Sequence, residues 1–187
     1  MSAPKRRATY EDLMQVPDHL VAEIIDGELI TSPRPATPHA RAHSVIGQDL
    51  SPFDRRPGSP GGPGGWWLLD EPELHFGDDV VVPDHAGWRR ERMPELPHTA
   101  YFTLAPDWIC EVASPSTAGL DRGEKMPLYA REKVAHVWIV DPIAKTLDVF
   151  RLDGETYRLV GTHSGDVRVR VEPFEAIELE LGALWAR

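Results

Sequence analysis

The sequence predicts a mixed α/β fold, with a central β-sheet flanked by at least two α-helices and followed by C-terminal antiparallel strands. The continuous apolar run at 108–113 is typical of a strand buried on both faces. Helical spacing occurs at 37–50 and between 121 and 133, and the C-terminal part alternates strand-like runs with turns. The 187 residues suffice for one domain and are too few for two, so we expect 1–187 to form a single domain.

The first predicted elements are a short helix and a hairpin. Thr9 is a candidate N-cap with acids following it in the first turn, and Pro17 ends the helix. Strand-like runs at 21–25 and 28–31 flank an Asp-Gly dipeptide that favours a tight hairpin turn. Glu23 therefore lies on the first strand of this hairpin.

A helix and a loop follow the hairpin. The helix at 37–50 is bounded by prolines and is predicted to start after Pro38. The prolines in the Pro- and Gly-rich stretch 57–65 lack the backbone N–H groups that regular helix and sheet hydrogen bonds need, and the stretch has few side chains to bury. We expect it to be a flexible loop inserted within the domain.

The middle of the chain contains most of the predicted sheet. Strands are expected at 66–69, 73–76 and 79–82, before an irregular polar stretch at 85–106 and the buried strand at 108–113. The next helix is predicted to start nearer Lys125 than Asp121, because Pro127 fits poorly inside a helix. Further strands are predicted at 137–140, at 146–152 and 156–160 as a second hairpin, and at 167–171 and 176–181 continuing that hairpin.

Composition narrows the class of protein. A single cysteine, Cys110, excludes an intrachain disulfide framework, and no apolar run reaches the roughly 18 residues of a membrane span, so a cytoplasmic location is expected. The net charge of -10 counts against broad electrostatic attraction to nucleic acid. The fold could still gather basic residues onto one face. Alternatively, these residues are ordinary solvent-exposed residues spread over the surface. These residues are grouped at Lys5 to Arg7, Arg55-Arg56, Arg89-Arg90-Arg92 and Arg122 to Lys133.

Two acids stand at the ends of apolar runs. Glu111 ends the buried strand, and Asp84 follows the run that closes with Pro83. A buried carboxylate needs a partner, and Mg²⁺ prefers carboxylate oxygens, so the pair predicts a divalent-metal site for phosphodiester chemistry, with the Val112 carbonyl as a further ligand. The two acids would meet if their strands were neighbours in one sheet. Alternatively, Asp84 is a turn residue and Glu111 pairs with an arginine, or the two acids act as a glycosidase pair.

A lysine and a third acid are candidates to join this site. Asp121, Lys125 and Tyr129 share one helical face, so Lys125 could orient a metal-bound water or offset charge on a phosphate. The alternative is a surface ion pair between Asp121 and Lys125. Glu23, inside an apolar run, could bind metal through water or hold a catalytic water, or it could point outward from an edge strand.

The ordered motifs resemble the Uma-two family of restriction-endonuclease-like proteins, part of the PD-(D/E)XK nuclease superfamily. The resemblance covers roughly residues 10 to 181. Its blocks are 23–29, Pro83-Asp84, 111–117, Asp121 with Lys125 and Tyr129, and 137–142.

The resemblance implies a restriction-endonuclease-like core and a Mg²⁺-dependent nuclease acting on DNA, with Mn²⁺ as an alternative ion. It implies that Asp84 and Glu111 bind the metal and that Glu23 supports them. The superfamily pattern has lysine two residues after the second acid, where this chain has Ala113, so Lys125 on the next helix would be its counterpart. By analogy with nucleases that cut two strands with two subunits, the chain could form a homodimer.

Two alternatives to a nuclease remain open. One is a catalytically inactive nuclease-fold module that binds nucleic acid or supports assembly, which the acidic balance and Ala113 favour. The other is hydrolysis of a substrate other than nucleic acid at the same metal site. His39 and His43 have the spacing of a zinc pair, but no third ligand is evident in the sequence.

Overall fold

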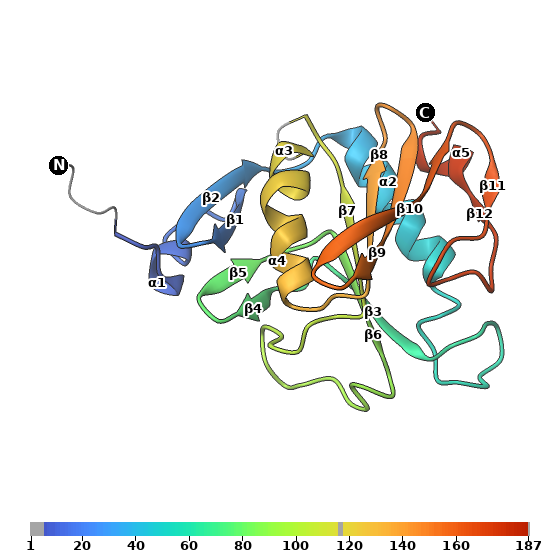
Figure 1. Ribbon diagram of the computed structural model, residues 1–187, viewed down its shortest axis with the longest axis horizontal. Coiled ribbons are helices and arrows are strands. Elements are labelled where there is room, and N and C mark those ends of the chain that lie inside the picture. The colour runs from blue at the N-terminus through green and yellow to red at the C-terminus, as the bar shows by residue number, and fades with distance from the viewer. Residues whose placement is uncertain (1–5, 116–117, 187) are drawn as a thin grey trace.

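The computed structural model describes residues 6–115 and 118–186, which form three β-sheets with helices on both faces of the largest (Figure 1). Ser116 and Thr117, the last two residues of the 111–117 block of the family resemblance, lie outside the described residues, as does Lys5 of the first basic group. The elements are α1 Tyr10–Leu13, β1 Leu20–Ile25, β2 Glu28–Pro33, α2 Thr37–Leu50, β3 Trp66–Asp70, β4 Leu74–Phe76, β5 Asp79–Val81, β6 His85–Arg89, β7 Trp108–Val112, α3 Ala118–Leu120, the π-helical turn η1 Asp121–Lys125, α4 Met126–Arg131, β8 His136–Asp141, β9 Thr146–Asp153, β10 Thr156–Ser164, β11 Arg168–Val169, β12 Leu179–Glu180 and α5 Leu181–Leu184.

The six-stranded central sheet has the order β10-β9-β8-β7-β6-β3, with β7 and β8 parallel and the other neighbours antiparallel. This mixed sheet, with α2 behind it and α4 in front (Figure 1), confirms the predicted fold class. Side chains alternate along β7: Trp108, Cys110 and Val112 pack in the cluster that includes α2, while Ile109 and Ala113 pack in the cluster that includes α4. Glu111 therefore points to the α4 side.

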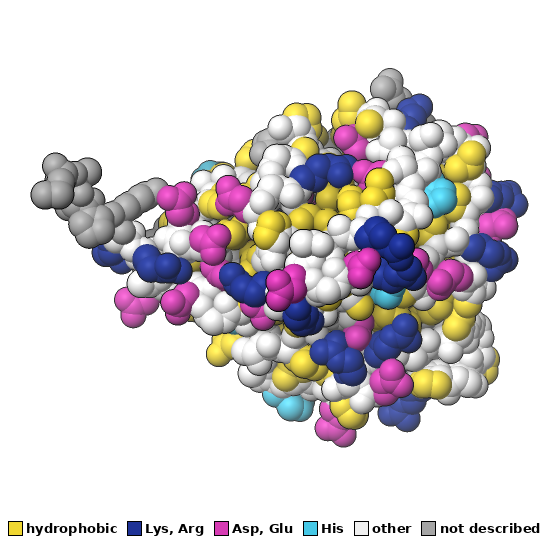
Figure 2. Space-filling model, in the orientation of Figure 1, with side chains coloured by type: hydrophobic (Ala, Val, Ile, Leu, Met, Phe, Trp, Pro, Cys, Tyr) yellow, Lys and Arg dark blue, Asp and Glu magenta, His cyan; other side chains and the backbone are white. Residues whose placement is uncertain are grey.

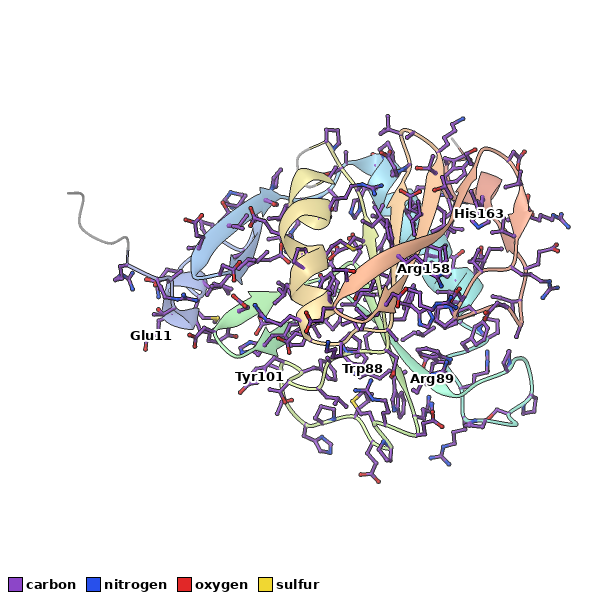
Figure 3. All side chains as sticks on the ribbon, in the orientation of Figure 1. Glu11, Trp88, Arg89, Tyr101, Arg158 and His163 are labelled. Carbon is purple, nitrogen blue, oxygen red and sulfur yellow. The ribbon has the colours of Figure 1, made fainter. Side chains whose placement is uncertain are left out.

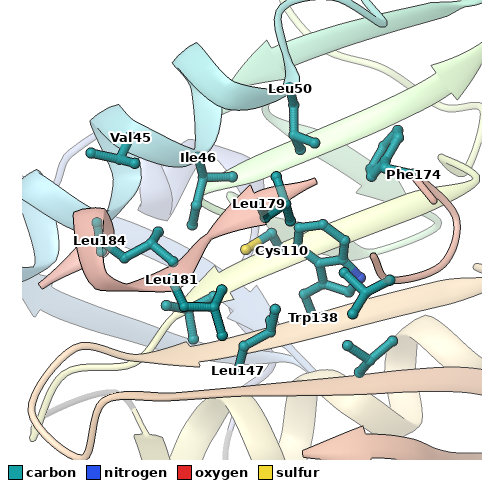
Figure 4. Packing of buried hydrophobic residues seen from close by; sticks show 14 of the residues in the cluster. Val45, Ile46, Leu50, Cys110, Trp138, Leu147, Phe174, Leu179, Leu181 and Leu184 are labelled. Atoms are coloured by element: carbon teal, nitrogen blue, oxygen red, sulfur yellow. The ribbon is translucent and has the colours of Figure 1, made fainter. Parts of the chain in front are cut away.

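The core between α2 and the sheet is closed by the C-terminal elements (Figure 4). Val45, Ile46 and Leu50 of α2 face Trp138 of β8 across this layer. Burial of these side chains, at about 25 cal/mol per Å² of apolar surface, holds α2 in register on the sheet. The histidines of α2 are thereby held at a fixed position relative to the strand ends.

A second sheet with the order β2-β1-β5-β4 contains the predicted hairpin. Asp26 and Gly27 have φ values of 51° and 82°, the left-handed conformations that a tight hairpin turn requires. β1 lies between β2 and β5, with Ile24 paired to Val80. The alternative in which Glu23 points outward from an edge strand is therefore wrong, and its side chain is buried.

The irregular stretch predicted at 85–106 is wrong at its start, because 85–89 is the strand β6. β6 lies between β3 and β7 in the central sheet. Its composition, with a histidine and a glycine, lacks the branched residues typical of strands. Packing explains the glycine, since a Cβ on Gly87 would lie 2.8 Å from Leu68 Cδ2. The strand therefore depends on close contacts with neighbouring strands, and the strand propensity of its own residues does not include those contacts.

The helix predicted between 121 and 133 begins earlier, at Ala118, so the prediction of a start nearer Lys125 is wrong, and the helix changes form along its length. α3, η1 and α4 follow one another, and the Met126 N–H donates to the Asp121 carbonyl, five residues back. Pro127 has no N–H, and in an α-helix its ring would crowd the carbonyl of Gly123. The wider π-helical turn removes that conflict and carries Asp121 and Lys125, and such turns are frequent at functional sites.

The C-terminal strands differ from the prediction after the second hairpin. β9 and β10 form the hairpin as expected, whereas β11 and β12 pair only with each other as a separate two-stranded sheet. The helix α5 follows, and sequence reasoning missed it. In the predicted flexible loop, Gly64 and Gly65 donate to the carbonyls of Pro52 and Arg55, which anchors the loop's end, and its flexibility stays a prediction.

Candidate active site

A cavity of about 260 Å³ opens where the end of β2, the start of α2, the end of β7 and η1 meet. In Figure 1 the tip of β2 lies beside α3, close to the beginning of α2. Glu23, Asp84, Glu111 and Lys125, the four residues selected from the sequence, all line this cavity, together with Val112. They come from four separate segments of the chain, which the two larger sheets and the helix bring together.

Lys125 is the centre of a buried ionic cluster. Its Nζ lies 2.9 Å from Glu23 Oε1, 3.3 Å from Glu111 Oε1 and 3.6 Å from Asp121 Oδ1. Tyr129 donates its hydroxyl to the same Glu111 oxygen. Asp121 and Lys125 are 2% and 4% exposed, so the interpretation as a surface ion pair is wrong. The helical face predicted from spacing packs directly over Glu111.

Charge in this cluster is unbalanced. Burial raises the pKa of Glu111 well above its ordinary value; Lys125 opposes this, while Asp121, Asp84 and Glu23 add to it. Burial would lower the pKa of Lys125, but the carboxylates of Glu111, Glu23 and Asp121 raise it on balance, so the ammonium stays charged. One cation therefore stands among several carboxylates.

Asp84 also lines the cavity, and both of its carboxylate oxygens have partners. Its Oδ2 accepts from the Val112 N–H at 2.6 Å, and its Oδ1 is 3.0 Å from His39 Nε2. Burial alone would raise the pKa of Asp84, but the His39 hydrogen bond and charge and the Val112 N–H lower it on balance. Asp84 is therefore an oriented, ionised carboxylate rather than a loose turn residue.

The predicted route by which Asp84 and Glu111 meet is wrong in one respect. The apolar run before Asp84 is β5, which belongs to the second sheet and is not a neighbour of β7. Asp84 instead lies just before β6, and β6 is the antiparallel neighbour of β7, with His85 opposite Cys110. The two acids still line one cavity, because the chain crosses between the sheets at this point.

The residues at this cavity fit a hard divalent cation. The N–H and C=O of one residue in an extended strand point to the same side, so the carbonyl of Val112 faces the Asp84 side, as its N–H does. The donor set of Asp84, Glu111 and this carbonyl is all oxygen, which Mg²⁺ and Mn²⁺ prefer. Burial first, and then the nearby acids Asp121, Asp84 and Glu23, raise the pKa of Glu111, and a bound cation would oppose both effects.

Glu23 connects Lys125 to the second sheet. Its Oε1 accepts from the backbone N–H of Val82 at 2.8 Å and from Lys125. This double contact fixes the position of the ammonium relative to the segment that leads to Asp84. Glu23 therefore links Lys125 to the second sheet.

Sequence reasoning missed one acid at the cavity. Glu71 lines it, with its side chain 44% exposed, 3.9 Å from Arg34, and its backbone at a φ of 47°. A non-glycine residue at positive φ is uncommon and often occurs at a functional site. No local pattern marks Glu71, since it stands before a proline in a strand connection.

Among the described residues, the basic groups do not gather at the cavity, with the exception of Lys125. Arg89 and Arg90 lie at the far end of β6 from Asp84, over the rings of Trp66 and Trp67 at 4.5 and 3.3 Å. Figure 3 places Arg89 near Trp88 at this end, and Figure 2 shows basic and acidic side chains interspersed on this face. Of the lysines and arginines in the described part of the chain, Arg34 and Lys125 line the cavity.

None of the described helices combines the length and the apolar character needed to span a membrane.

Comparison with known proteins places the chain in a family. The model of the Uma2 family, described as "Putative restriction endonuclease", matches residues 8–183. The fold resembles the crystal structure of an Anabaena variabilis protein described as a putative nuclease belonging to DUF820, with a TM-score of 0.72 and 22% identity over 95% of this chain and 97% of that chain. No curated protein matches the sequence. Because the family model spans all four selected residues and confirms the resemblance found in the sequence, the chain belongs to the Uma2 family of restriction-endonuclease-like proteins.

Proposed function

We propose that this protein is a metal-dependent endonuclease that hydrolyses DNA phosphodiester bonds with an activated water. The observation that carries the proposal is the convergence of Asp84, Glu111, Glu23 and Lys125 on one cavity in a nuclease-like fold. Membership of a family described as restriction endonuclease supports DNA as the substrate. The all-oxygen donor set supports Mg²⁺ or Mn²⁺ as the cofactor.

Each residue has a distinct role in this proposal. Asp84, Glu111 and the Val112 carbonyl would hold the ion, which when bound lowers the pKa of water and offsets charge on a phosphate. His39 and the Val112 N–H orient the Asp84 carboxylate before any ion arrives.

Lys125 would contribute at the transition state. Its ammonium can donate to the attacking water or to a phosphate oxygen while Glu23 and Asp121 hold its position. Ala113 lies on the same face of β7 as Glu111, and η1 covers that face. Lys125 on the helix thus reaches Glu111, the carboxylate beside which the superfamily pattern would place a lysine at position 113.

A second candidate function is an inactive nuclease-fold module that binds nucleic acid or supports assembly. The position of Arg89 and Arg90, at the end of β6 away from the cavity, favours it, because few basic side chains flank the cavity to hold DNA there. A homodimer, which would supply two cavities for two strands, is a further part of the nuclease proposal.

A cleavage assay tests the proposal. Wild-type protein with Mg²⁺ or Mn²⁺ should cut DNA offered as single-stranded, duplex and branched substrates, and Asp84→Asn should lower the rate by about 100-fold or more, the scale of losing a metal ligand or a comparable stabilising contact. Asp78→Asn, an exposed acid in the β4–β5 turn, is the matched control and should leave the rate unchanged. Equal rates for wild type and Asp84→Asn would refute the assignment, and metal binding without cleavage of any DNA would favour another substrate.

A further inference from the structure

Two histidines on α2 contact Asp84. His39 Nε2 lies 3.0 Å from Asp84 Oδ1, and His43 Nε2 lies 3.0 Å from the Asp84 backbone carbonyl. The two rings are nearly parallel, as the four-residue spacing on a helix allows. No third ligand for this histidine pair is evident in the sequence, but in the fold acidic side chains lie beside the pair.

Glu71 and Asp84 supply that missing donor set. One ligand atom from each of His43, Glu71 and Asp84 lies within 4.8 Å of the others. The Glu71 N–H donates to the Asp84 carbonyl at 2.9 Å, and this same carbonyl contacts His43. The three residues are therefore tied to one backbone atom, and the positive φ of Glu71 is part of this arrangement.

We propose that His43, Glu71 and Asp84 form a second cation site that shares Asp84 with the first and prefers Mn²⁺ or another divalent transition metal over Mg²⁺. The inference rests on the proposed function, because Asp84 belongs to both sites. Glu71 and Asp84 both line the cavity, so an ion held there would be open to substrate.

The donor set determines the selectivity. Zn²⁺, Fe²⁺ and Ni²⁺ suit an imidazole nitrogen, and Mn²⁺, although it favours oxygen, accepts one more readily than Mg²⁺, which demands near-octahedral oxygen ligands and keeps several waters. Two carboxylates and one imidazole also give the site a net charge that favours a divalent cation. The first site, with oxygens only, has no such preference.

A neighbouring group of similar composition is a weaker candidate. His43, Asp70 and His85 also lie within 4.8 Å of one another. Both ring nitrogens of His85 are already engaged, Nδ1 with Asp70 at 2.7 Å and Nε2 with the His43 carbonyl at 3.0 Å. The rings of His43 and His85 also stack face to face at 4.0 Å, so their in-plane lone pairs do not converge on one ion. This group instead holds α2 against the sheet.

Calorimetric titration of metal-free protein tests the second site. Wild type should bind two Mn²⁺ per chain. Glu71→Gln and His43→Asn should each keep one high-affinity Mn²⁺, and their affinity for the second Mn²⁺ should fall by at least about tenfold. Mg²⁺ should fill one site in all three proteins. Glu155→Gln and His98→Asn, both exposed and away from the cavity, are the matched controls and should still bind two Mn²⁺. Melting curves in chelator should show that Glu71→Gln, at a half-exposed position, keeps the fold.

The outcomes separate this inference from the proposed function. One Mn²⁺ per chain in wild type, unchanged in Glu71→Gln and His43→Asn but lost in Glu111→Gln, would overturn the second site and leave the first. No Mn²⁺ binding in wild type would overturn both. Loss of one ion in Glu71→Gln and His43→Asn with the other retained would support the second site.

Discussion

Lys125→Met should lower the free energy of unfolding by about 3–5 kcal/mol, the cost of removing one partner from a buried ion pair, and should abolish DNA cleavage. Lys125 is the cation that contacts the carboxylates of Glu23, Glu111 and Asp121 inside the cluster. Without it, these buried acids repel one another, and Glu111, whose pKa is already raised, would take up a proton first. The loss should therefore be smaller at pH 5 than at pH 8.

Denaturant unfolding of the metal-free protein at both pH values measures this effect. Lys145→Met, which removes an exposed lysine from the β8–β9 turn, is the control and should change stability by less than about 0.5 kcal/mol. If Lys125→Met were as stable as the control, the buried cluster would not have the electrostatic role assigned to it.

Glu111→Gln should make the metal-free protein more stable at pH 8 while removing its activity. Burial, Asp121, Asp84 and Glu23 hold the pKa of Glu111 well above its ordinary value. A raised pKa in the folded state means that folding favours the protonated acid, so this contribution is present below the unfolded pKa of about 4.5 and is lost as pH rises through the folded pKa. Glutamine resembles the protonated form, keeps an acceptor for Tyr129 and never ionises.

The expected gain at pH 8 exceeds about 1 kcal/mol, since one pKa unit corresponds to about 1.4 kcal/mol. Thermal melting in chelator from pH 4.5 to 8 should show the variant and wild type converging at the acid end. Glu155→Gln, an exposed acid, should follow wild type at every pH. A variant less stable than wild type at pH 8 would mean that Lys125 stabilises the Glu111 carboxylate more than burial and like charges oppose it.

The sequence was most informative where local pattern and burial agree. The run that ends in Glu111 is apolar on both faces, and β7 is a central strand buried on both faces. Asp121, Lys125 and Tyr129 share a face in any helix, but only the packing of η1 and α4 on the sheet decides that this face is buried. Spacing alone therefore left a surface ion pair as a fair alternative.

The surroundings of Asp84 were least predictable. β6 has little strand propensity and is selected by contacts around Gly87, so the neighbour of β7 could not be identified from its own residues. Glu71 reaches the cavity through a backbone conformation that its sequence does not favour. Both features depend on residues distant in the chain.

An anomalous difference map from a crystal soaked with Mn²⁺ would show whether Asp84 and Glu111 hold an ion. We expect a peak in the cavity within about 2.0–2.3 Å of oxygens of Asp84 and Glu111 and of the Val112 carbonyl, with Glu111 drawn partly away from Lys125. A cavity that stays without a peak at millimolar Mn²⁺, with Glu111 still held by Lys125 and Tyr129, would contradict this expectation.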